Sequence, residues 1–409
     1  MSLSTRALII LTSLNLLDYL DRNLIAALGP LVKADLGLSH RGFGFLTTAF
    51  FLVYLFTSPV FGYLGDRWGR IRLMAGGAAI WSLATSLTFW VSSYPTLLLA
   101  RGAVGVGEGS FGTLAPAYLS DLVPLRRRTR ALGLFYLALP VGTALGFLVG
   151  GLVGAHWGWR PAFLLAGLPG LAVAGLVYCL PQAPLQDRGE LATEAHFWGA
   201  AWRESWALWH IPTLRWVTLG YAMITFTLGG LNIWMPTYLQ GFKGLSLLHA
   251  DLLLCGAVAL AGGLGTVAGG FLGSRLQAYS LRAPLWISLG GVILAIPMAA
   301  LVIFVNRPAL YIPGLAAAVF LLFSNFGILT AVVVSVAGPR RRAQAVALNI
   351  VIIHLLGDVP SPSLMGWVAD LWGLQWGVSL SLVALAAGAV LIFKALPHLP
   401  KDLAAAGEL

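Results

Sequence analysis

The sequence alternates long apolar runs with short polar segments. Each run has about the 20 residues that an α-helix needs to cross the apolar core of a bilayer. The pattern predicts twelve membrane-spanning helices, at residues 7–28, 42–64, 73–92, 95–121, 131–155, 161–180, 214–239, 249–274, 283–305, 308–336, 343–371 and 374–396. We therefore predict an all-α membrane protein of two pseudo-symmetric six-helix bundles. The predicted domains are residues 1–180, a cytoplasmic linker at 181–212, residues 213–396 and a cytoplasmic tail at 397–409.

The linker carries a regular tryptophan pattern. Trp198, Trp202, Trp206 and Trp209 follow one another at helical spacing, so the indoles share one face of a helix. We expect an amphipathic helix that lies at the membrane surface, with the indoles as interfacial anchors.

Composition agrees with the apolar pattern and indicates the orientation. Hydrophobic residues make up 58% of the chain and charged residues 10%, whereas a soluble protein has about 25% charged residues. The formal charge of +10 does not indicate nucleic acid, because the basic residues stand in short clusters between apolar runs, such as 126–128 and 340–342. The positive-inside rule makes those clusters and both termini cytoplasmic. The basic residues are mostly arginine, which indicates a high-GC bacterium, so we predict a location in a bacterial inner membrane. We also expect a monomer.

Corresponding loops of the two halves echo each other. Residues 62–67 read Gly-Tyr-Leu-Gly-Asp-Arg after the second run, and residues 270–275 read Gly-Phe-Leu-Gly-Ser-Arg after the eighth. Internal repeats of this kind are typical of secondary transporters, whose substrate site lies between the repeats near the bilayer midplane. The repeat therefore predicts two parallel halves with a site between them.

The first apolar run contains three charged side chains. A charge at bilayer depth costs about 2.5–3.5 kcal/mol on insertion scales, so such residues usually have a partner or a function. Asp18 and Asp21 are three residues apart, and Asp18 and Arg22 are four apart. On a helix this spacing places all three on one side, which predicts a polar cluster inside the membrane.

Several motifs carry a family resemblance. Residues 62–70 resemble the cytoplasmic loop signature of the major facilitator superfamily, residues 101–109 its fourth-helix motif, and residues 140–151 its glycine-rich fifth helix. Asp18-Tyr-Leu-Asp21-Arg22, the segment around Glu108 and residues 354–362 are more narrowly similar to the Spinster family.

This resemblance implies a function. Spinster members are proton-linked transporters of sphingosine-1-phosphate or lysophospholipids, and their proton-coupling and headgroup positions correspond to Asp21, Arg22 and Glu108. One departure is Asp18, where many relatives carry Asn; it either adds a second titrating carboxylate or positions Arg22.

A proton site also follows from the charges themselves. Burial raises the pKa of a carboxyl group and a nearby guanidinium lowers it, so a carboxylate under both influences can exchange protons in the physiological range. Asp18, Asp21 and Glu108 against Arg22 and Arg101 leave one negative charge, which one proton would neutralise. The alternative is a static salt-bridge network. Arg101 either grips a substrate phosphate or pairs with Asp21 or Asp18.

Candidate substrate contacts in the second half are fewer. His354 and Asp358 are four residues apart on the eleventh run, before Pro360 and Pro362, which interrupt a helix. They are predicted to contact substrate or relay protons, or else to form only a local hydrogen bond at the kink. Asn232 and Trp234 complete the predicted substrate contacts. A charged first half and an apolar, aromatic second half suit an amphiphile.

The signature loop is predicted to be a conformational gate. Its residues are Gly62, Asp66, Arg67, Gly69 and Arg70. A purely topogenic basic loop does not require the glycines, which allow close helix approach.

No nucleotide-binding loop and no metal-ligand spacing is visible, so we expect no cofactor, with the proton as coupling ion. We predict a proton-coupled transporter of lysolipid-like or sphingolipid-like amphiphiles that alternates access by rocking its halves. The alternative is a proton-coupled exporter of drugs or small organic ions on the same fold. A lipid-modifying enzyme is disfavoured because no nucleophile–base pair is visible.

Overall fold

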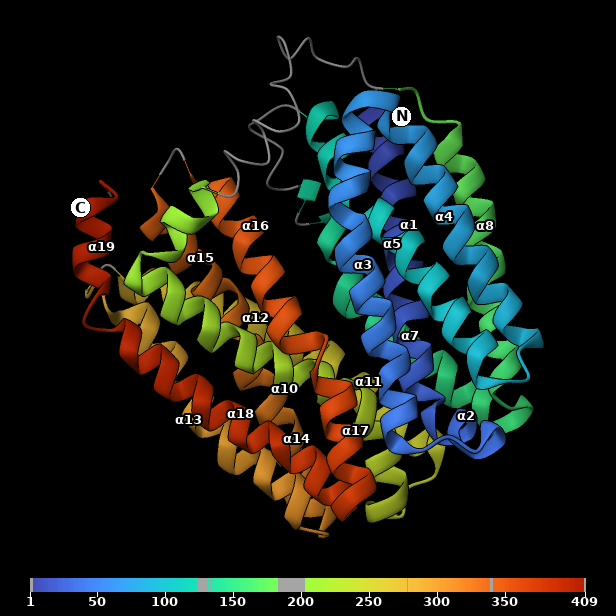
Figure 1. Ribbon diagram of the computed structural model, residues 1–409. Helices are drawn as coiled ribbons and strands as arrows, with labels where there is room; N and C mark the ends of the chain where they lie inside the picture. Colours follow the sequence, from blue (N-terminus) through green and yellow to red (C-terminus); the bar gives the residue numbers. More distant parts are fainter. Residues whose placement is uncertain are drawn as a thin grey trace. The chain divides into compact units, whose positions relative to one another are not determined.

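The described chain is almost entirely helical. The computed structural model describes residues 3–123, 131–132, 134–182, 203–277, 279–338 and 341–407 (Figure 1). Within these residues, 11 helices are long and apolar enough to cross a membrane. With α5, which carries Arg101 and Glu108, the twelve predicted spans are all present as helices. Helices are expected because a backbone inside a bilayer must satisfy its hydrogen bonds internally.

The described residues of the first six spans and their connections include a series of helical elements. They are α1 (Leu3–Ala27), α2 (Gly29–Leu36), α3 (His40–Trp68), α4 (Arg70–Leu87), η1 (Thr88–Trp90), α5 (Tyr94–Leu122), α7 (Ala138–Trp157) and α8 (Trp159–Tyr178). The elements after the linker are α10 (Pro212–Lys243), α11 (Leu247–Gly256), η2 (Ala257–Gly262), α12 (Gly263–Gln277), α13 (Ala283–Phe304), α14 (Pro308–Phe323), α15 (Asn325–Ala337), α16 (Arg342–Ile353), η3 (His354–Asp358), α17 (Ser361–Trp372), α18 (Leu374–Ala395) and α19 (Leu399–Ala405).

Polar residues and glycines set the helix ends. Ser39 caps α3 by accepting a hydrogen bond from the backbone N–H of Gly42, 3.1 Å away. Gly69 separates α3 from α4 with φ +92°, a conformation that residues with a Cβ rarely adopt. That glycine of the signature loop therefore makes the reversal between the two helices possible.

The linker helix is only partly described. Trp198 and Trp202 lie outside the described residues, whereas residues 203–209 are helical and Trp206 is exposed. The amphipathic helix stays a prediction for the rest of the linker.

The chain divides into two compact units. Unit 1 contains residues 1–187, 232–259 and 362–374, and unit 2 contains residues 188–231, 260–361 and 375–409. Unit 1 thus joins the first six spans to one end of α10, to α11 and to α17. The four predicted domain boundaries stay predictions, because contact-based units need not follow the sequence repeat.

Close helix packing organises unit 1. Within it, α1 packs on α7 and α8, α4 packs on α5 and α8, and α3 packs on α5. A Cβ atom at Gly142 would lie 2.6 Å from the carbonyl oxygen of Leu16, and one at Gly146 would lie 2.7 Å from that of Leu20. These glycines bring the backbones of α7 and α1 together.

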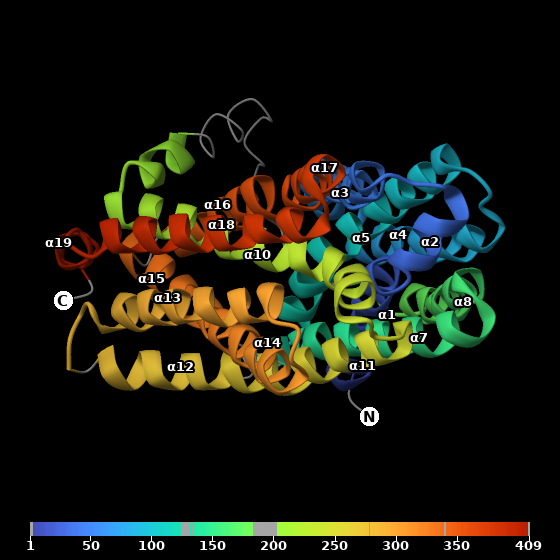
Figure 2. The ribbon, with the colours of Figure 1, turned by 90° about the horizontal axis from the view of Figure 1, so that it is seen from below.

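Unit 1 has two ends along its helices. We call the end that holds α2 the α2 end, and the end that holds the chain start the amino-terminal end (Figure 1). The carbonyl of Leu122, where α5 ends, accepts a hydrogen bond from Ser4 at the amino-terminal end. Figure 2 shows α11 alongside α7 near the α2 end.

Unit 2 has its own apolar core. Residues of α10, α13, α15, α16 and α18 build it, with Leu214, Leu285, Val333, Ala345 and Leu385 fully buried.

Candidate proton and substrate site

Arg22 of α1 is the centre of the charged cluster. Its Nε and Nη2 atoms donate hydrogen bonds of 3.0 and 2.7 Å to the same oxygen, Oε2 of Glu108 on α5. Its Nη2 also lies 3.5 Å from Oδ2 of Asp18, one helical turn earlier on α1. Two carboxylates therefore share one guanidinium nitrogen.

Asp21 is directed to a different partner. One oxygen of its carboxylate accepts a short hydrogen bond from the hydroxyl of Thr85 on α4, and the residue is 1% exposed. Asp18 and Arg22 approach each other as their spacing predicts, and the place of Asp21 on the same side stays a prediction. Consecutive residues on a helix are rotated by about 100°, so Asp21 and Arg22 meet different neighbours.

Arg101 of α5 is buried, and it forms no ion pair with the residues that the structure describes. It is 2% exposed, and its Nε has no hydrogen-bond partner among the described residues. Its guanidinium carbon lies 5.0 Å from the ring centre of Phe50 on α3, and that of Arg22 lies 5.2 Å from the same ring. Such distances are typical of cation–π interactions, so Phe50 contacts both cations of the cluster.

Three carboxyl oxygens of the cluster are buried and accept no hydrogen bond from the described residues. Oδ1 of Asp18, Oδ1 of Asp21 and Oε1 of Glu108 are buried without a hydrogen-bond partner among the described residues. An unsatisfied buried polar atom costs about 1–3 kcal/mol. A proton, a water or a substrate group at these oxygens would relieve that cost.

Aromatic side chains surround Arg22. They are not among the site residues predicted from the sequence. The ring centres of Tyr19, Tyr54 and Phe51 lie 4.9, 5.5 and 6.0 Å from its guanidinium carbon. Tyr19 and Arg22 are three residues apart on α1, and this spacing predicts a contact between them. The α3 aromatics stand in an ordinary apolar run, so only packing identifies them.

Asn232 and Trp234 of α10 belong to unit 1. Asn232 donates to Oδ1 of Asn23 over 2.9 Å, and Asn23 donates to Thr143 on α7 over 3.1 Å. Trp234 is fully buried, and its indole N–H donates to the carbonyl of Pro362 over 3.0 Å. The structure places Trp234 in helix packing, and its role as a substrate contact stays a prediction.

The α2 end of unit 1 is held together by Asp370 of α17. Its carboxylate accepts hydrogen bonds from the backbone N–H groups of His40 and Arg41, each 2.8 Å long, and lies 2.9 Å from Nδ1 of His40. These N–H groups begin α3, and a negative charge stabilises a helix N-terminus. Lys33 of α2 adds a contact, with its ammonium 5.4 Å from the ring of Trp234.

The predicted pair His354 and Asp358 is present in unit 2. Nδ1 of His354 lies 2.6 Å from Oδ2 of Asp358 in η3, a π-helical stretch between α16 and α17. A Cβ at Gly229 of α10 would lie 3.3 Å from the Cα of Asp358. The geometry fits the local hydrogen bond, and substrate contact or proton relay stays a prediction.

The predicted gate is described only in part. The side chains of Asp66 and Arg67 lie outside the described part of the structure. A Cβ at Gly62 would lie 3.4 Å from Thr113 of α5, so the signature loop packs closely on that helix. Arg70 forms an ion pair with Asp121 at the end of α5, a partner that the sequence analysis did not identify.

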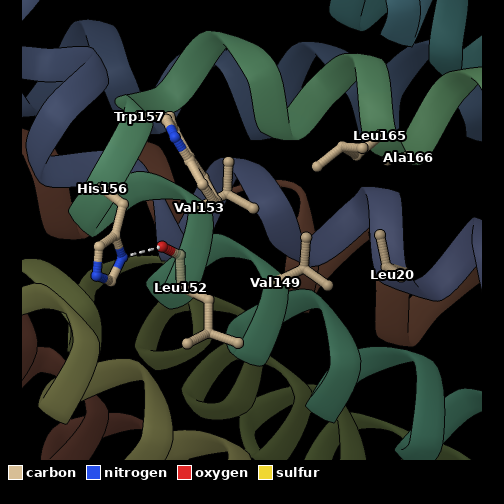
Figure 3. A pocket seen from close by; sticks show the side chains of 8 residues that line it. All are labelled: Leu20, Val149, Leu152, Val153, His156, Trp157, Leu165 and Ala166. Atoms are coloured by element: carbon tan, nitrogen blue, oxygen red, sulfur yellow. Dashed lines mark hydrogen bonds between the residues drawn. The ribbon is translucent and has the colours of Figure 1, made fainter.

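An apolar cavity of about 440 Å³ lies beside α1 in unit 1 (Figure 3). Its lining residues come from α1, α7 and α8 and are Leu20, Val149, Leu152, Val153, His156, Trp157, Leu165 and Ala166. The His156 ring is hydrogen-bonded through Nδ1 to the carbonyl of Leu152, 2.8 Å away. None of the predicted site residues lines this cavity.

Comparison with known proteins identifies the family. Residues 11–362 match the family model described as Major Facilitator Superfamily. The Xenopus laevis protein named "Protein spinster homolog 1" is 34% identical over 389 residues, which cover 88% of this chain and 72% of that protein. This chain belongs to the Spinster family of the Major Facilitator Superfamily. It is therefore a multi-pass membrane protein with the fold of these transporters.

A further relative supports the Spinster assignment, and a solved structure has the same fold. The Mus musculus protein named "Sphingosine-1-phosphate transporter SPNS2" is 32% identical over 380 residues, which cover 87% of this chain and 68% of that protein. A crystal structure of a bacterial homologue of the human lysosomal transporter Spinster, in an inward-facing and unoccupied conformation, has a TM-score of 0.88. It covers 98% of each chain at 22% identity, and this similarity shows the fold alone.

Proposed function

We propose that this Spinster-family chain is a proton-coupled transporter of lysolipid-like or sphingolipid-like amphiphiles. The observation that carries the proposal is the contact of Arg22 with one oxygen of Glu108, while the other oxygen is buried and unpartnered. Buried ion pairs contribute little to stability compared with apolar packing, which favours a functional role for the pair.

Proton binding would change what Arg22 contacts. A proton on Oε1 of Glu108 removes the charge that holds the guanidinium, and Asp18 at 3.5 Å is then its remaining acidic neighbour. A released guanidinium can bind a phosphate through two parallel hydrogen bonds. Proton and anionic headgroup would therefore compete or cooperate at Arg22, and this exchange is the proposed coupling.

The cargo class follows from the cluster and from the family. One mouse relative is named a sphingosine-1-phosphate transporter. Sphingosine-1-phosphate has one phosphate and one alkyl chain. Arg22 and Arg101 supply two cations for such a headgroup, and the apolar, aromatic runs of the second half suit the chain. The proposed substrate is a single-chain lipid with an anionic or zwitterionic headgroup.

Alternating access assigns roles to the two ends of unit 1. The basic clusters favour a bacterial inner membrane in which the amino-terminal end of unit 1 and both termini face the cytoplasm. The contacts of Asp370 with His40 and Arg41 then hold the outer side closed. The signature loop, with Arg70 paired to Asp121, is the proposed cytoplasmic gate.

Uptake into proteoliposomes tests the proposal. Purified monomer is reconstituted, and a panel of lysolipids and sphingosine-1-phosphate is offered with and without an imposed pH gradient. We expect gradient-dependent uptake of single-chain phospholipids, with the chemical structure of the cargo unchanged. Uptake that is the same with and without the pH gradient would refute proton coupling. Competition by hydrophilic organic ions rather than by single-chain lipids would refute the lipid cargo.

A further inference from the structure

Asp251 is a buried carboxyl group that the proposed mechanism does not use. It lies on α11 near the α2 end of unit 1 and is 0% exposed. Neither Oδ1 nor Oδ2 has a hydrogen-bond partner among the described residues. This combination distinguishes it from the cluster carboxylates Asp18 and Glu108, each of which reaches Arg22 with one oxygen.

The carboxyl group lies against a glycine of the neighbouring helix. A Cβ at Gly151 of α7 would lie 2.8 Å from Cβ of Asp251 and 3.2 Å from its Oδ2. Figure 2 shows α7 and α11 side by side. The missing side chain at Gly151 is what leaves room for the carboxyl group between the two helices.

Ionisable side chains on the surrounding elements have other contacts. The imidazole of His156 on α7 bonds to the carbonyl of Leu152, and that of His249 on α11 lies 2.6 Å from the hydroxyl of Ser246. On α2, Lys33 lies over Trp234, and Asp35 pairs with Arg160 at 2.8 Å. The ammonium of Lys243, where α10 ends, lies 5.4 Å from the ring of Tyr238. In the described parts of the chain, Asp251 forms no ion pair with any of them.

A charged carboxylate in this position would be very costly. An isolated buried charge without a partner is so unfavourable that the group binds a proton instead. The packed helices therefore require the neutral acid. When α7 and α11 separate and water enters, the carboxyl group resembles an ordinary aspartic acid, which is ionised at neutral pH.

We propose that Asp251 is a second proton-binding site, which holds a proton while α7 and α11 are packed and releases it when they separate. Release breaks the O–H bond of the acid, and water accepts the proton to leave a carboxylate and a hydronium ion. The inference rests on the proposed alternating access, but not on the site at Glu108. On this inference, Asp251 binds one proton when the α2 end closes.

Linkage gives the direction of the pH effect. The packed form binds one proton more than the separated form, so acid favours the packed form. The ratio of separated to packed molecules rises by up to about tenfold for each pH unit. Because the pKa of Lys33 on α2 is lowered to about 8 by burial, measurements that end about one pH unit lower keep Lys33 mostly protonated.

Distance measurements on the full chain test the inference. Spin labels at Trp157 on α7 and Leu252 on α11, both exposed, report the separation in a background in which Cys179 and Cys255 are serine. We expect longer distances as the pH rises from about 5 to about 7. Asp251→Asn, which mimics the protonated acid, should lengthen less than the wild type as the pH rises. His40, whose ring faces Asp370, is the same in both chains, so the difference belongs to Asp251.

A matched control separates packing from titration. Gly151→Ala inserts a methyl group at the same contact and should lengthen the distance at each pH while keeping the pH response. A pH response as large in Asp251→Asn as in the wild type would overturn the proposal, as would a wild-type distance that does not depend on pH. If Asp251→Asn does not fold, the protonation of the wild-type carboxyl group can be measured directly. Infrared difference spectroscopy of the wild-type chain, with isotopically labelled aspartate, makes this measurement. Without a protonated-carboxyl band that is lost as the pH rises, the proposal fails.

The two proposals can fail separately. Lysolipid uptake that ignores a pH gradient, together with an Asp251-dependent distance change, refutes proton coupling at Glu108 and leaves this site intact. Gradient-driven uptake together with a distance that does not depend on Asp251 refutes this site alone.

Discussion

Arg22 donates two hydrogen bonds, 3.0 and 2.7 Å long, to a single oxygen of Glu108. A bidentate arrangement would use both carboxylate oxygens. Here the second oxygen of Glu108 is free of hydrogen-bond partners in the described structure, and Asp18 approaches the same Nη2 of Arg22. Asp18 is thus positioned as an alternative partner for Arg22 when Glu108 is protonated.

Glu108→Gln should remove proton coupling while preserving exchange of substrate. The amide resembles the protonated acid and no longer titrates. For one coupled proton, a gradient of one pH unit supports about a tenfold accumulation of substrate, and the variant should show none. Uptake with and without the gradient measures this. Glu204→Gln, at an exposed glutamate, is the matched control and should behave as the wild type.

Arg101→Lys should discriminate between phosphorylated and neutral amphiphiles. Lysine keeps the charge but lacks the planar fork that binds two phosphate oxygens. If Arg101 grips a phosphate, the Kd for a phosphorylated lysolipid should rise about tenfold, while that of a neutral analogue barely changes. Equal losses for both ligands would instead indicate that Arg101 acts through Asp21 or Glu108.

Phe50→Leu should destabilise the cluster more than Phe51→Leu. Phe50 lies under both guanidiniums, at 5.2 and 5.0 Å, whereas Phe51 lies 6.0 Å from Arg22. Each cation–π contact contributes about 0.5–1 kcal/mol or more when desolvated. Thermal unfolding in detergent should show the larger decrease in Tm for the Phe50 variant. The opposite order would contradict a shared aromatic contact.

Asp370→Asn should open the α2 end more often. The substitution removes the charge that caps the N–H groups of His40 and Arg41. Losing a helix cap costs about 0.5–2 kcal/mol, which corresponds to about a 2- to 30-fold change in population. Accessibility of a cysteine at the α2 end to a membrane-impermeant reagent reports the change. Asp35→Asn, which breaks a more exposed ion pair with Arg160, should have a smaller effect.

Lys33→Met should remove a pH dependence above neutrality. Burial lowers the pKa of Lys33 to about 8, although Asp370 partly opposes this shift. When the α2 end opens, the pKa returns to about 10.4. Between these values the open form binds more protons, so raising the pH through this range stabilises the packed form. Between about pH 8 and about pH 10, the Tm of the wild type should include a stabilisation that grows with pH and that the methionine variant lacks.

Local spacing made part of the site predictable from the sequence. Residues four apart on a helix are neighbours whatever surrounds them. The contacts of Asp18 with Arg22 and of His354 with Asp358 follow from this rule, and the structure shows both. The apolar runs predicted the spans for a similar reason, because a helix needs a fixed length to cross a bilayer.

Tertiary packing decided which helix faces meet. Thr85 bonds to Asp21 across 64 positions of sequence, and Glu108 binds Arg22 across 86. The apolar runs resemble one another in composition, so nothing in a single run shows that Phe50 contacts two arginines or that Asp251 lies against Gly151. The sequence by itself therefore determined the spans, the family and the local pairs. Only the packed structure decided the partners of each charge, since those partners depend on how helices rotate and pack against one another.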